Sequence, residues 1–261
     1  MMDDNNRAIW TDARTIDVYS KRIFLYEPEK IILSKFKNDL KSWNMLDIGV
    51  GAGRTTHFFA DKVQNYTGID YSQAMVKACQ ERFPNRNFTA CDVRDMKIFK
   101  NDCFDFVLFS FNGIDSIISS DDRLRALKEI KRVCKNKGGL VFFSSHNLGY
   151  IEELFKFKLY RIINASMTSN NPLINIARYF GLRIMNWNKN PKGNVNYTII
   201  RDGSEYFRHQ TYYINPEKQI EELYNLGFKM VRAYSLNGKE INIKSGFEEI
   251  KDPWIHYLCQ R

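Results

Sequence analysis

Cysteines, membrane-length apolar segments and export signals are scarce or missing in this sequence. Its five cysteines form no C-x-x-C pair and no cluster of the kind that binds metals. Scattered cysteines argue against secretion and favour a reducing compartment, so we expect a cytoplasmic protein without a bound metal. The polar start of the chain lacks the apolar stretch of a signal peptide. The longest apolar runs, such as Phe104–Phe111, are too short to cross a bilayer, so we expect no membrane partner.

The sequence also lacks any block of five or six like charges, although its formal net charge is +9. A basic balance fits nucleic acid, an anionic membrane surface, an anionic substrate, or simply a soluble basic surface. The absence of a Lys/Arg-rich arm disfavours nucleic acid. With 261 residues, 44% of them hydrophobic, the chain can bury a sizeable core in one large α/β domain or one domain with an elaboration.

A third absence is the dinucleotide fingerprint G-x-G-x-x-G, although the segment Asn44–Arg54 is rich in glycine. A fingerprint starting at Gly49 and Gly51 would need a third glycine where Arg54 stands. The pair that starts at Gly51 would need one where Thr56 stands. The pattern present is D-x-G-x-G-x-G after a short apolar run, which predicts a buried strand, a tight turn and a ligand approaching bare backbone. Its members are Asp47, Gly49, Gly51 and Gly53.

Apolar runs of strand length alternate with segments of helical periodicity from Asn44 onward. Such alternation predicts an α/β fold with a doubly wound, mostly parallel, seven-stranded sheet and helices on both faces. The predicted strands are Met45–Ile48, Tyr66–Ile69, Asn87–Ala90, Phe104–Ser110, Leu140–Ser144, Phe228–Ala233 and Trp254–Cys259, and the predicted helices are Thr55–Lys62, Gln73–Phe83, Asp121–Lys135 and Pro216–Leu226.

The alternation is interrupted once, which suggests three parts. We expect an N-terminal helical cap (1–40), a nucleotide-type domain (41–150 and 214–261), and a helical and hairpin insertion after the fifth strand (151–213). Between residues 151 and 210, nine Lys and Arg stand against four Asp and Glu, with aromatic residues interleaved. The insertion is expected to form a substrate lid, although its aromatic residues would equally suit a second small core. Its hairpin is predicted from Asn196–Arg201, the turn Asp202-Gly203-Ser204, and Glu205–Tyr213.

Acidic or polar residues follow each of the first four predicted strands. Parallel strands present their carboxyl ends at one edge, where ligands bind in open α/β sheets. Asp70 suits both hydroxyls of a ribose, or alternatively stabilises the N-terminus of the next helix. Asp92, followed by Val93, suits an adenine edge, or is simply a turn residue. Ser110-Phe111-Asn112-Gly113 ends the fourth strand, where a reacting group would lie.

Together these motifs resemble those of the class I S-adenosylmethionine (SAM)-dependent methyltransferases over about residues 40–147. The resemblance implies a Rossmann-like fold and SAM as cofactor. The chain lacks the Asn-Pro-Pro-Tyr or Asp-Pro-Pro-Tyr motif after the fourth strand, so it looks more like the branch that methylates small molecules. The cofactor-binding residues that we expect are Asp47, Gly49, Gly51, Gly53, Asp70, Tyr71, Asp92, Val93, Ser110 and Asn112.

Methyl transfer to oxygen benefits from a base, and the chain has four histidines. His146, after the fifth strand, is the first candidate for base or substrate anchor, and His209 is the second; either is also compatible with a structural role. We expect methyl transfer to an O or N atom of a small metabolite, sugar or natural product, with an anionic or aromatic acceptor. The alternatives are an RNA or protein methyltransferase that uses the basic insertion, and a non-catalytic SAM-binding subunit.

Overall fold

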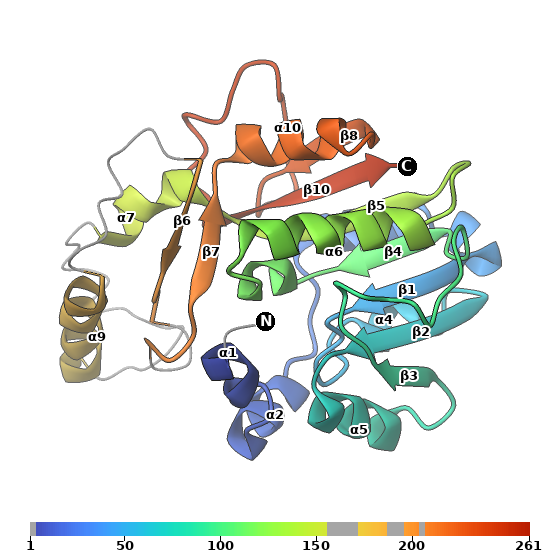
Figure 1. Cartoon of the computed structure of the whole chain (residues 1–261), viewed down its shortest axis with the longest axis horizontal. Helices are drawn as coiled ribbons and strands as arrows, with labels where there is room; N and C mark the ends of the chain where they lie inside the picture. The colour runs from blue at the N-terminus through green and yellow to red at the C-terminus, as the bar shows by residue number, and fades with distance from the viewer. Residues whose placement is uncertain (1–3, 156–171, 187–195, 204–206) are drawn as a thin grey trace.

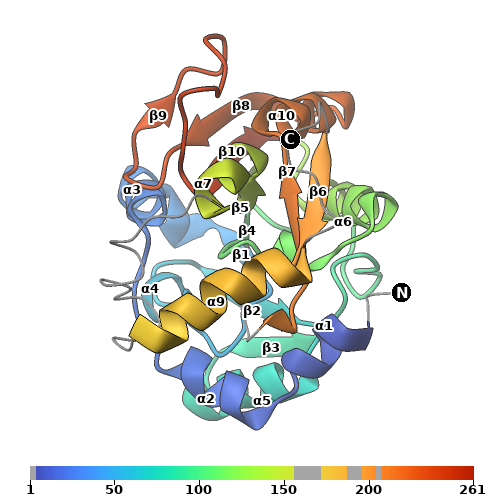
Figure 2. The same cartoon turned by 90° about the vertical axis from the view of Figure 1, so that its left-hand side faces the viewer.

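The computed structural model describes residues 4–155, 172–186, 196–203 and 207–261. The N-terminal segment forms helices α1 (Asp4–Ile9), α2 (Ala13–Ser20) and α3 (Glu27–Lys35), then a 3-10 turn, η1 (Asp39–Ser42). Helix α3 begins where Pro28 fits the first turn and the Glu29 carboxylate accepts the Tyr26 backbone N–H at 2.8 Å. Helix α2 lies against α5 (Gln73–Arg82), as Figure 2 shows.

The predicted alternation of strands and helices is confirmed between residues 44 and 147. Helix α5 begins at Gln73, as predicted, where Ser72 is the N-cap and its hydroxyl accepts the Met75 N–H at 3.3 Å. The helix predicted over Thr55–Lys62 is shorter and covers only Thr56–Phe59 as α4. The other elements are β1 (Asn44–Ile48), β2 (Asn65–Asp70), β3 (Asn87–Ala90), β4 (Phe106–Phe109), η2 (Gly113–Ser116), α6 (Ser120–Val133) and β5 (Leu140–Asn147).

In the described part of the chain the sheet has ten strands rather than the predicted seven, in the order β3-β2-β1-β4-β5-β10-β8-β9; β7 also pairs with β5, and β6 pairs with β7. The pairs among β3, β2, β1, β4 and β5 are parallel, while β10 runs antiparallel to both β5 and β8, so the mostly parallel architecture is confirmed. Figure 1 shows β10 pointing toward the C-terminus with β5 beside it. The later elements are η3 (Leu148–Tyr150), α7 (Ile151–Phe155), α9 (Pro172–Met185), β6 (Tyr197–Ile200), β7 (Thr211–Ile214), α10 (Pro216–Asn225), β8 (Lys229–Tyr234), β9 (Glu240–Ile241) and β10 (Trp254–Gln260).

Strand β5 is longer than predicted and carries His146 within the sheet rather than in an exit loop. The reason is long-range pairing: β10 accompanies β5 along its length, up to the Trp254–His146 pair. Beyond the end of β4, β5 pairs in parallel with β7, at His146–Tyr213.

The predicted hairpin is confirmed in part. Strands β6 and β7 pair antiparallel, but the second strand, predicted from Glu205, begins only at Thr211. The Arg201 guanidinium donates to the carbonyls of Phe207 and Arg208, and Phe207 has a positive φ of 62°, so this stretch leaves the ladder. Residues 156–171, 187–195 and 204–206 of the predicted insertion lie outside the described residues.

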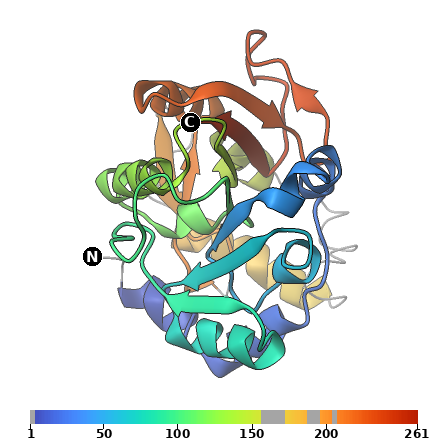
Figure 3. The same cartoon turned by 90° about the vertical axis from the view of Figure 1, so that its right-hand side faces the viewer.

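Side chains of the central strands alternate between two cores, one on each face of the sheet. Val107 and Phe109 pack with residues of α6 and α10, while Phe106 and Leu108 pack with residues of α3, α4 and α5. All four are at most 3% exposed, as a central parallel strand requires. Figure 3 shows the side of the molecule opposite to that in Figure 2, with the teal helix α5 along the base. No helix in the described part of the chain has both the length and the apolarity to cross a membrane.

Candidate functional site

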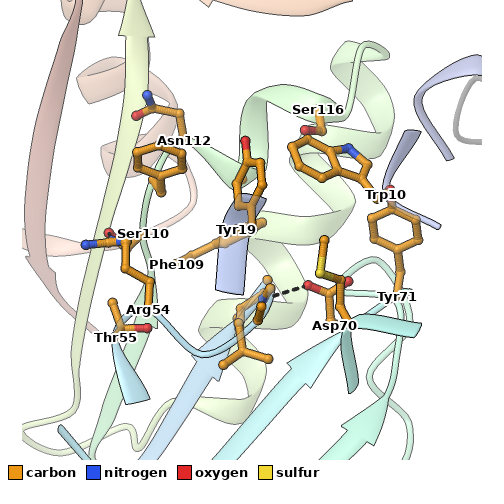
Figure 4. A pocket seen from close by; sticks show the side chains of 18 of the residues that line it. Trp10, Tyr19, Arg54, Thr55, Asp70, Tyr71, Phe109, Ser110, Asn112 and Ser116 are labelled. Atoms are coloured by element: carbon orange, nitrogen blue, oxygen red, sulfur yellow. Dashed lines mark hydrogen bonds between the residues drawn. The ribbon is translucent and has the colours of Figure 1, made fainter. Parts of the chain in front are cut away.

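A cavity of about 480 Å³ lies where β1, β2 and β4 end. Figure 4 shows Trp10, Tyr71 and Asp70 on one side of it and Arg54, Thr55 and Ser110 on the other. All of the predicted site residues except Gly53 line this cavity: Asp47, Gly49, Gly51, Asp70, Tyr71, Asp92, Val93, Ser110, Asn112, His146 and His209.

Two glycines of the turn after β1 have different surroundings, although the sequence motif groups them together. Gly51 has φ +55°, and a Cβ there would meet no atom within 4 Å, so open space lies beside its backbone. Gly53 has φ +89°, but its Cβ would lie 2.5 Å from the Phe83 ring. Gly51 therefore suits a ligand that approaches the backbone, whereas Gly53 allows the turn to pack against α5 and its flank.

Asp70, at the end of β2, has its carboxylate oriented by two backbone donors. The Gly51 N–H donates to Oδ2 at 2.9 Å, and the Ser72 N–H donates to Oδ1 at 2.8 Å. Burial raises the pKa of Asp70 to about 6, although these two hydrogen bonds act to lower it. Each oxygen keeps acceptor capacity toward the cavity, since a carboxylate oxygen accepts more than one hydrogen bond.

Asp47 holds the glycine turn against the sheet. Its Oδ2 accepts the Thr55 hydroxyl and the Tyr66 phenol, both at 2.6 Å. Burial raises the pKa of Asp47 to about 6, against the lowering effect of the same two donors. Asp47 thus joins the end of β1 to the start of α4 and to β2, and it also lines the cavity.

Asp92, after β3, forms an ion pair that the sequence analysis missed. Arg94 donates from Nη2 to Oδ2 at 2.6 Å and from Nε to Oδ1 at 2.9 Å, and its own N–H also reaches Oδ1. Burial raises the pKa of Asp92, but Arg94 outweighs burial and leaves the pKa below its ordinary value. Arg94 also donates a hydrogen bond to Asp122 of α6 at 2.7 Å, so Arg94 links Asp92 to α6. Asp92 and its neighbour Val93 both line the cavity.

Ser110, at the end of β4, belongs to a buried charged network that the sequence analysis also missed. In the sequence, Arg54 stands where the dinucleotide fingerprint would need a glycine. In the structure, its guanidinium donates two hydrogen bonds to Glu29 at 2.6 and 2.7 Å. The Ser110 hydroxyl donates to Glu29 and accepts from Arg54 at 2.9 Å. This network joins α3 to the glycine turn, and its members Arg54 and Ser110 line the cavity, so the charge of Arg54 there is already compensated.

The chain leaves β4 through two consecutive left-handed residues, Phe111 (φ +54°) and Asn112 (φ +57°). Such backbone is unfavourable for residues other than glycine and is typical of functional sites. The Asn112 N–H donates to the Ser144 hydroxyl at 2.9 Å. Its buried Oδ1 finds no donor in the described part of the chain. This turn aims Phe111 and Asn112 into the cavity.

His146 is oriented by Asp115, a carboxylate with no solvent exposure. Asp115 Oδ2 accepts from the ring Nδ1 at 2.7 Å and from the His146 backbone N–H at 2.6 Å. Its other oxygen accepts from Arg123 at 2.6 Å and from the Ser145 hydroxyl at 2.7 Å. The proton assigned to Nδ1 leaves Nε2 as an acceptor, with Asn112 Nδ2 at 3.5 Å. His146 therefore presents a basic nitrogen in the cavity wall.

His209 differs from His146 in both partners and environment. Its Nε2 and Nδ1 each lie 3.1 Å from a hydroxyl, of Ser116 and of Thr211. Burial lowers the pKa of His209 to about 4, so the ring stays neutral near pH 7. Both ring nitrogens already have partners, which suits the positioning of Ser116 and Thr211 better than proton transfer.

The N-terminal helices close one side of the cavity, which the sequence analysis did not foresee beyond a helical cap. The Asn6 amide donates to the carbonyls of Ser116 at 3.2 Å and Gln210 at 3.0 Å, and its oxygen accepts the Gln210 N–H. The Ser72 hydroxyl donates to the Trp10 carbonyl at 2.8 Å. Helix α1 is thus bonded to η2 and to the segment before β7, and Trp10, which follows α1, is bonded to the N-cap of α5. The residues of this segment that line the cavity are Trp10, Val18, Tyr19 and Arg22.

The described ranges contain neither a disulfide nor a cluster of metal-ligating side chains. No group of three or more His, Cys, Asp or Glu side chains there is arranged to hold a metal ion. All five cysteines are free thiols, and none lines the cavity.

Comparisons with known proteins match the same part of the chain that the motifs occupy. Residues 45–138 match the family described as Methyltransferase domain. A demethylmenaquinone methyltransferase of Renibacterium salmoninarum is 30% identical over 132 residues, 49% of this chain and 54% of that protein. One of Paenarthrobacter aurescens is also 30% identical over 132 residues, 49% of this chain and 50% of that protein. The chain spans about half the length of the curated relatives it matches.

Solved structures share the fold across nearly the whole chain. A SAM-dependent methyltransferase from Clostridium acetobutylicum superposes with a TM-score of 0.62 at 16% identity, covering 95% of this chain and 97% of the other. The 1,6-didemethyltoxoflavin-N1-methyltransferase of Burkholderia thailandensis, solved with S-adenosylhomocysteine (SAH), gives 0.58 at 13% identity, covering 99% and 86%. Residues 45–138 therefore match a methyltransferase domain, and the chain shares its fold with solved SAM-dependent methyltransferases.

Proposed function

We propose that this chain is a SAM-dependent methyltransferase that methylates an oxygen or nitrogen atom of a small-molecule acceptor. The observation that carries the proposal is the pairing of His146 with the buried Asp115: the second ring nitrogen of His146 has only the long 3.5 Å contact to Asn112, and the ring lines the same cavity as Gly51 and Asp70. A carboxylate-oriented imidazole beside a nucleotide-type site is what proton removal from an acceptor requires.

The cofactor side of the cavity has the donors, acceptors and space that SAM needs. Open space beside Gly51 admits a ligand to the backbone, and Asp70 offers two oriented oxygens to ribose hydroxyls. Asp92 and Val93 border the cavity where an adenine ring would lie. Two lining residues carry buried polar atoms without a partner in the described part of the chain, Trp10 Nε1 and Asn112 Oδ1. When bound, SAM supplies an electrophilic methyl carbon on a positively charged sulfur.

The protein's own contribution is to orient the acceptor and to manage its proton. His146 Nε2 takes the proton of an acceptor hydroxyl or amine while that atom acts as the nucleophile. Asp115 stabilises the resulting imidazolium, because it already accepts the Nδ1 proton at 2.7 Å. Arg123 and Ser145 fix the second oxygen of Asp115, so the ring keeps its orientation.

Residues from separate parts of the chain surround the acceptor side, which supports a small molecule over a polymer. Tyr19 belongs to the N-terminal segment, Gly203 and His209 to the insertion, and Trp254 to β10, yet all four line one cavity. This supports the proposed cap (1–40) and the described part of the proposed lid (151–213). The relatives named above act, by their names, on demethylmenaquinone and 1,6-didemethyltoxoflavin, both small molecules.

The test is a methyl-transfer assay with the full chain, SAM and a panel of phenols, amines and sugars, with SAH formation as the readout. Acceptor-dependent SAH production by the wild type is the expected result. SAH binding without turnover on any acceptor would instead favour a non-catalytic SAM-binding subunit. Turnover on total RNA or on a protein extract alone would favour a polymer-modifying enzyme, and binding that falls steeply with salt would support the RNA case.

A further inference from the structure

Aromatic rings form a continuous wall between the N-terminal segment and β10. Tyr19 meets Phe111 edge-on with ring centroids 6.1 Å apart, and Tyr26 stacks on Phe111 at 5.9 Å. Tyr26 also meets Trp254 at 5.5 Å, and Trp254 lies 6.0 Å from His146. Tyr19, Phe111, Trp254 and His146 all line the cavity. A wall of this kind offers a planar ring both stacking and edge contacts.

One cation of this wall differs from the other arginines near the cavity. The Arg22 guanidinium lies 4.1 Å from the Tyr19 ring centroid and 5.2 Å from that of Phe111. It is partly buried and lines the cavity, and no carboxylate of the described ranges forms an ion pair with it. Arg54 and Arg123, by contrast, are paired with Glu29 and Asp115. A partly buried cation without a counterion favours an anionic ligand.

Phe111 connects this cation to the proposed base. Its ring contacts Arg22, and the next residue, Asn112, lies with its amide 3.5 Å from His146 Nε2. The left-handed backbone at both residues holds this arrangement. A ring resting on Phe111 would therefore have Arg22 within reach of one substituent and His146 within reach of another.

We infer that the methyl acceptor is a planar aromatic carboxylate whose ring packs against Phe111 and Tyr19, whose carboxylate pairs with Arg22, and whose hydroxyl or amine faces His146. The guanidinium fork matches a carboxylate with two parallel hydrogen bonds, and the aromatic wall matches the ring. This inference rests on the proposed function, since it names the substrate class of the same site.

The experiment compares two probes that share one ring and one phenol, 4-hydroxybenzoate and 4-hydroxybenzamide. Each is titrated by calorimetry into the SAH-saturated full chain. We expect 4-hydroxybenzoate to bind about tenfold or more tightly than the amide, which is the usual effect of a charge-assisted hydrogen bond. Arg22→Gln should bring the two affinities within about twofold of each other. Lys21→Gln is the matched control, because Lys21 is exposed and pairs only with Asp17 in the described ranges.

Equal affinity of the two probes for the wild type, or binding of neither, overturns the inference. Discrimination that survives in Arg22→Gln overturns it as well. Loss of SAH affinity in Arg22→Gln would assign this arginine to the cofactor instead of the acceptor, again against the inference. Failure of the proposed function is recognised separately, since in that case the wild type does not bind SAH before any probe is added.

Discussion

The proposed function divides the cavity into a cofactor half and an acceptor half, and the two are built in different ways. The cofactor half (Asp47, Gly49, Gly51, Asp70, Asp92 and Val93) comes from one continuous stretch, at the ends of the first three strands. The acceptor half (Tyr19, Arg22, Phe111, His146, His209 and Trp254) comes from the N-terminal segment, the exit of β4, the last residues of β5, the segment before β7, and the start of β10.

The two halves differ in construction because one would bind a cofactor and the other a particular acceptor. The residues that match the methyltransferase domain family, 45–138, include the whole cofactor half, whereas most of the acceptor half lies outside them. A cofactor that many enzymes share can be bound by one local arrangement of residues. A particular acceptor needs a binding surface to which distant segments of the chain contribute. Variants in one half should therefore leave the chemistry of the other half largely intact.

The largest expected effect is in the acceptor half, on turnover. His146→Ala should lower kcat about 10²–10⁴-fold, because the acceptor loses its base, while SAH affinity stays within about twofold. His57→Ala is the matched histidine control, since His57 is exposed on α4 and does not line the cavity. Turnover by His146→Ala at the wild-type rate would show that this histidine has a structural role. A loss of SAH affinity as large as the loss of kcat would show that the two halves do not act separately.

The next effect is in the cofactor half, on binding. Asp70→Asn should weaken SAH binding about 10- to 100-fold, because the ribose hydroxyls lose a charged acceptor. Asp92→Asn should cost less than Asp70→Asn, since Asp92 is already committed to Arg94. Calorimetric titration of both variants, each first shown to be folded by circular dichroism, gives the comparison. A larger loss for Asp92→Asn would reverse the assigned roles.

A smaller effect should appear with pH in the same half. The pKa of Asp70 is about 6 in the free protein, and hydrogen bonds from a bound ribose would favour its ionised form and lower that pKa. SAH affinity should therefore be full above pH 7 and fall by about tenfold by pH 5, as Asp70 takes up a proton. Asp70→Asn should remove this dependence. A flat profile for the wild type would show that Asp70 does not gain charge-dependent contacts from the ligand.

The smallest expected effects distinguish two glycines of one motif. Gly53→Ala should lower the free energy of unfolding by about 1–3 kcal/mol, because the new methyl overlaps the Phe83 ring at a positive φ. Gly51→Ala should cost only about 1 kcal/mol in stability, but it should weaken SAH binding because its methyl enters open space beside the cavity. Urea unfolding and SAH titration of both variants test this. The opposite ranking in either assay would contradict the separation of roles.

The cofactor half could be predicted from the sequence because its residues follow strands in order. Once Met45–Ile48 and its successors are recognised as parallel strands, their carboxyl ends must meet at one edge, so Asp47, Asp70 and Asp92 come together by topology. The fold class followed from the same alternation. Gly53 is the exception among the predicted site residues: its motif placed it at the site, but it does not line the cavity.

The acceptor half depends on contacts between distant residues, which no local pattern encodes. Glu29 and Arg54 are 25 positions apart, and Asp115 and His146 are 31 apart, so their pairing appears only in the folded chain. His146 was expected in a loop, and it lies in β5 because β10 extends the pairing to Trp254. Asn6 is an ordinary polar residue in sequence, yet it is fully buried and bonds η2 and Gln210.

The most direct test of the account is a calorimetric titration of SAH into the folded wild-type chain, repeated with Asp70→Asn and His146→Ala. The account predicts saturable binding at one site per chain, weakened about 10- to 100-fold in Asp70→Asn and unchanged within about twofold in His146→Ala. Absence of SAH binding to the folded wild type, or equal affinity of wild type and Asp70→Asn, would contradict it.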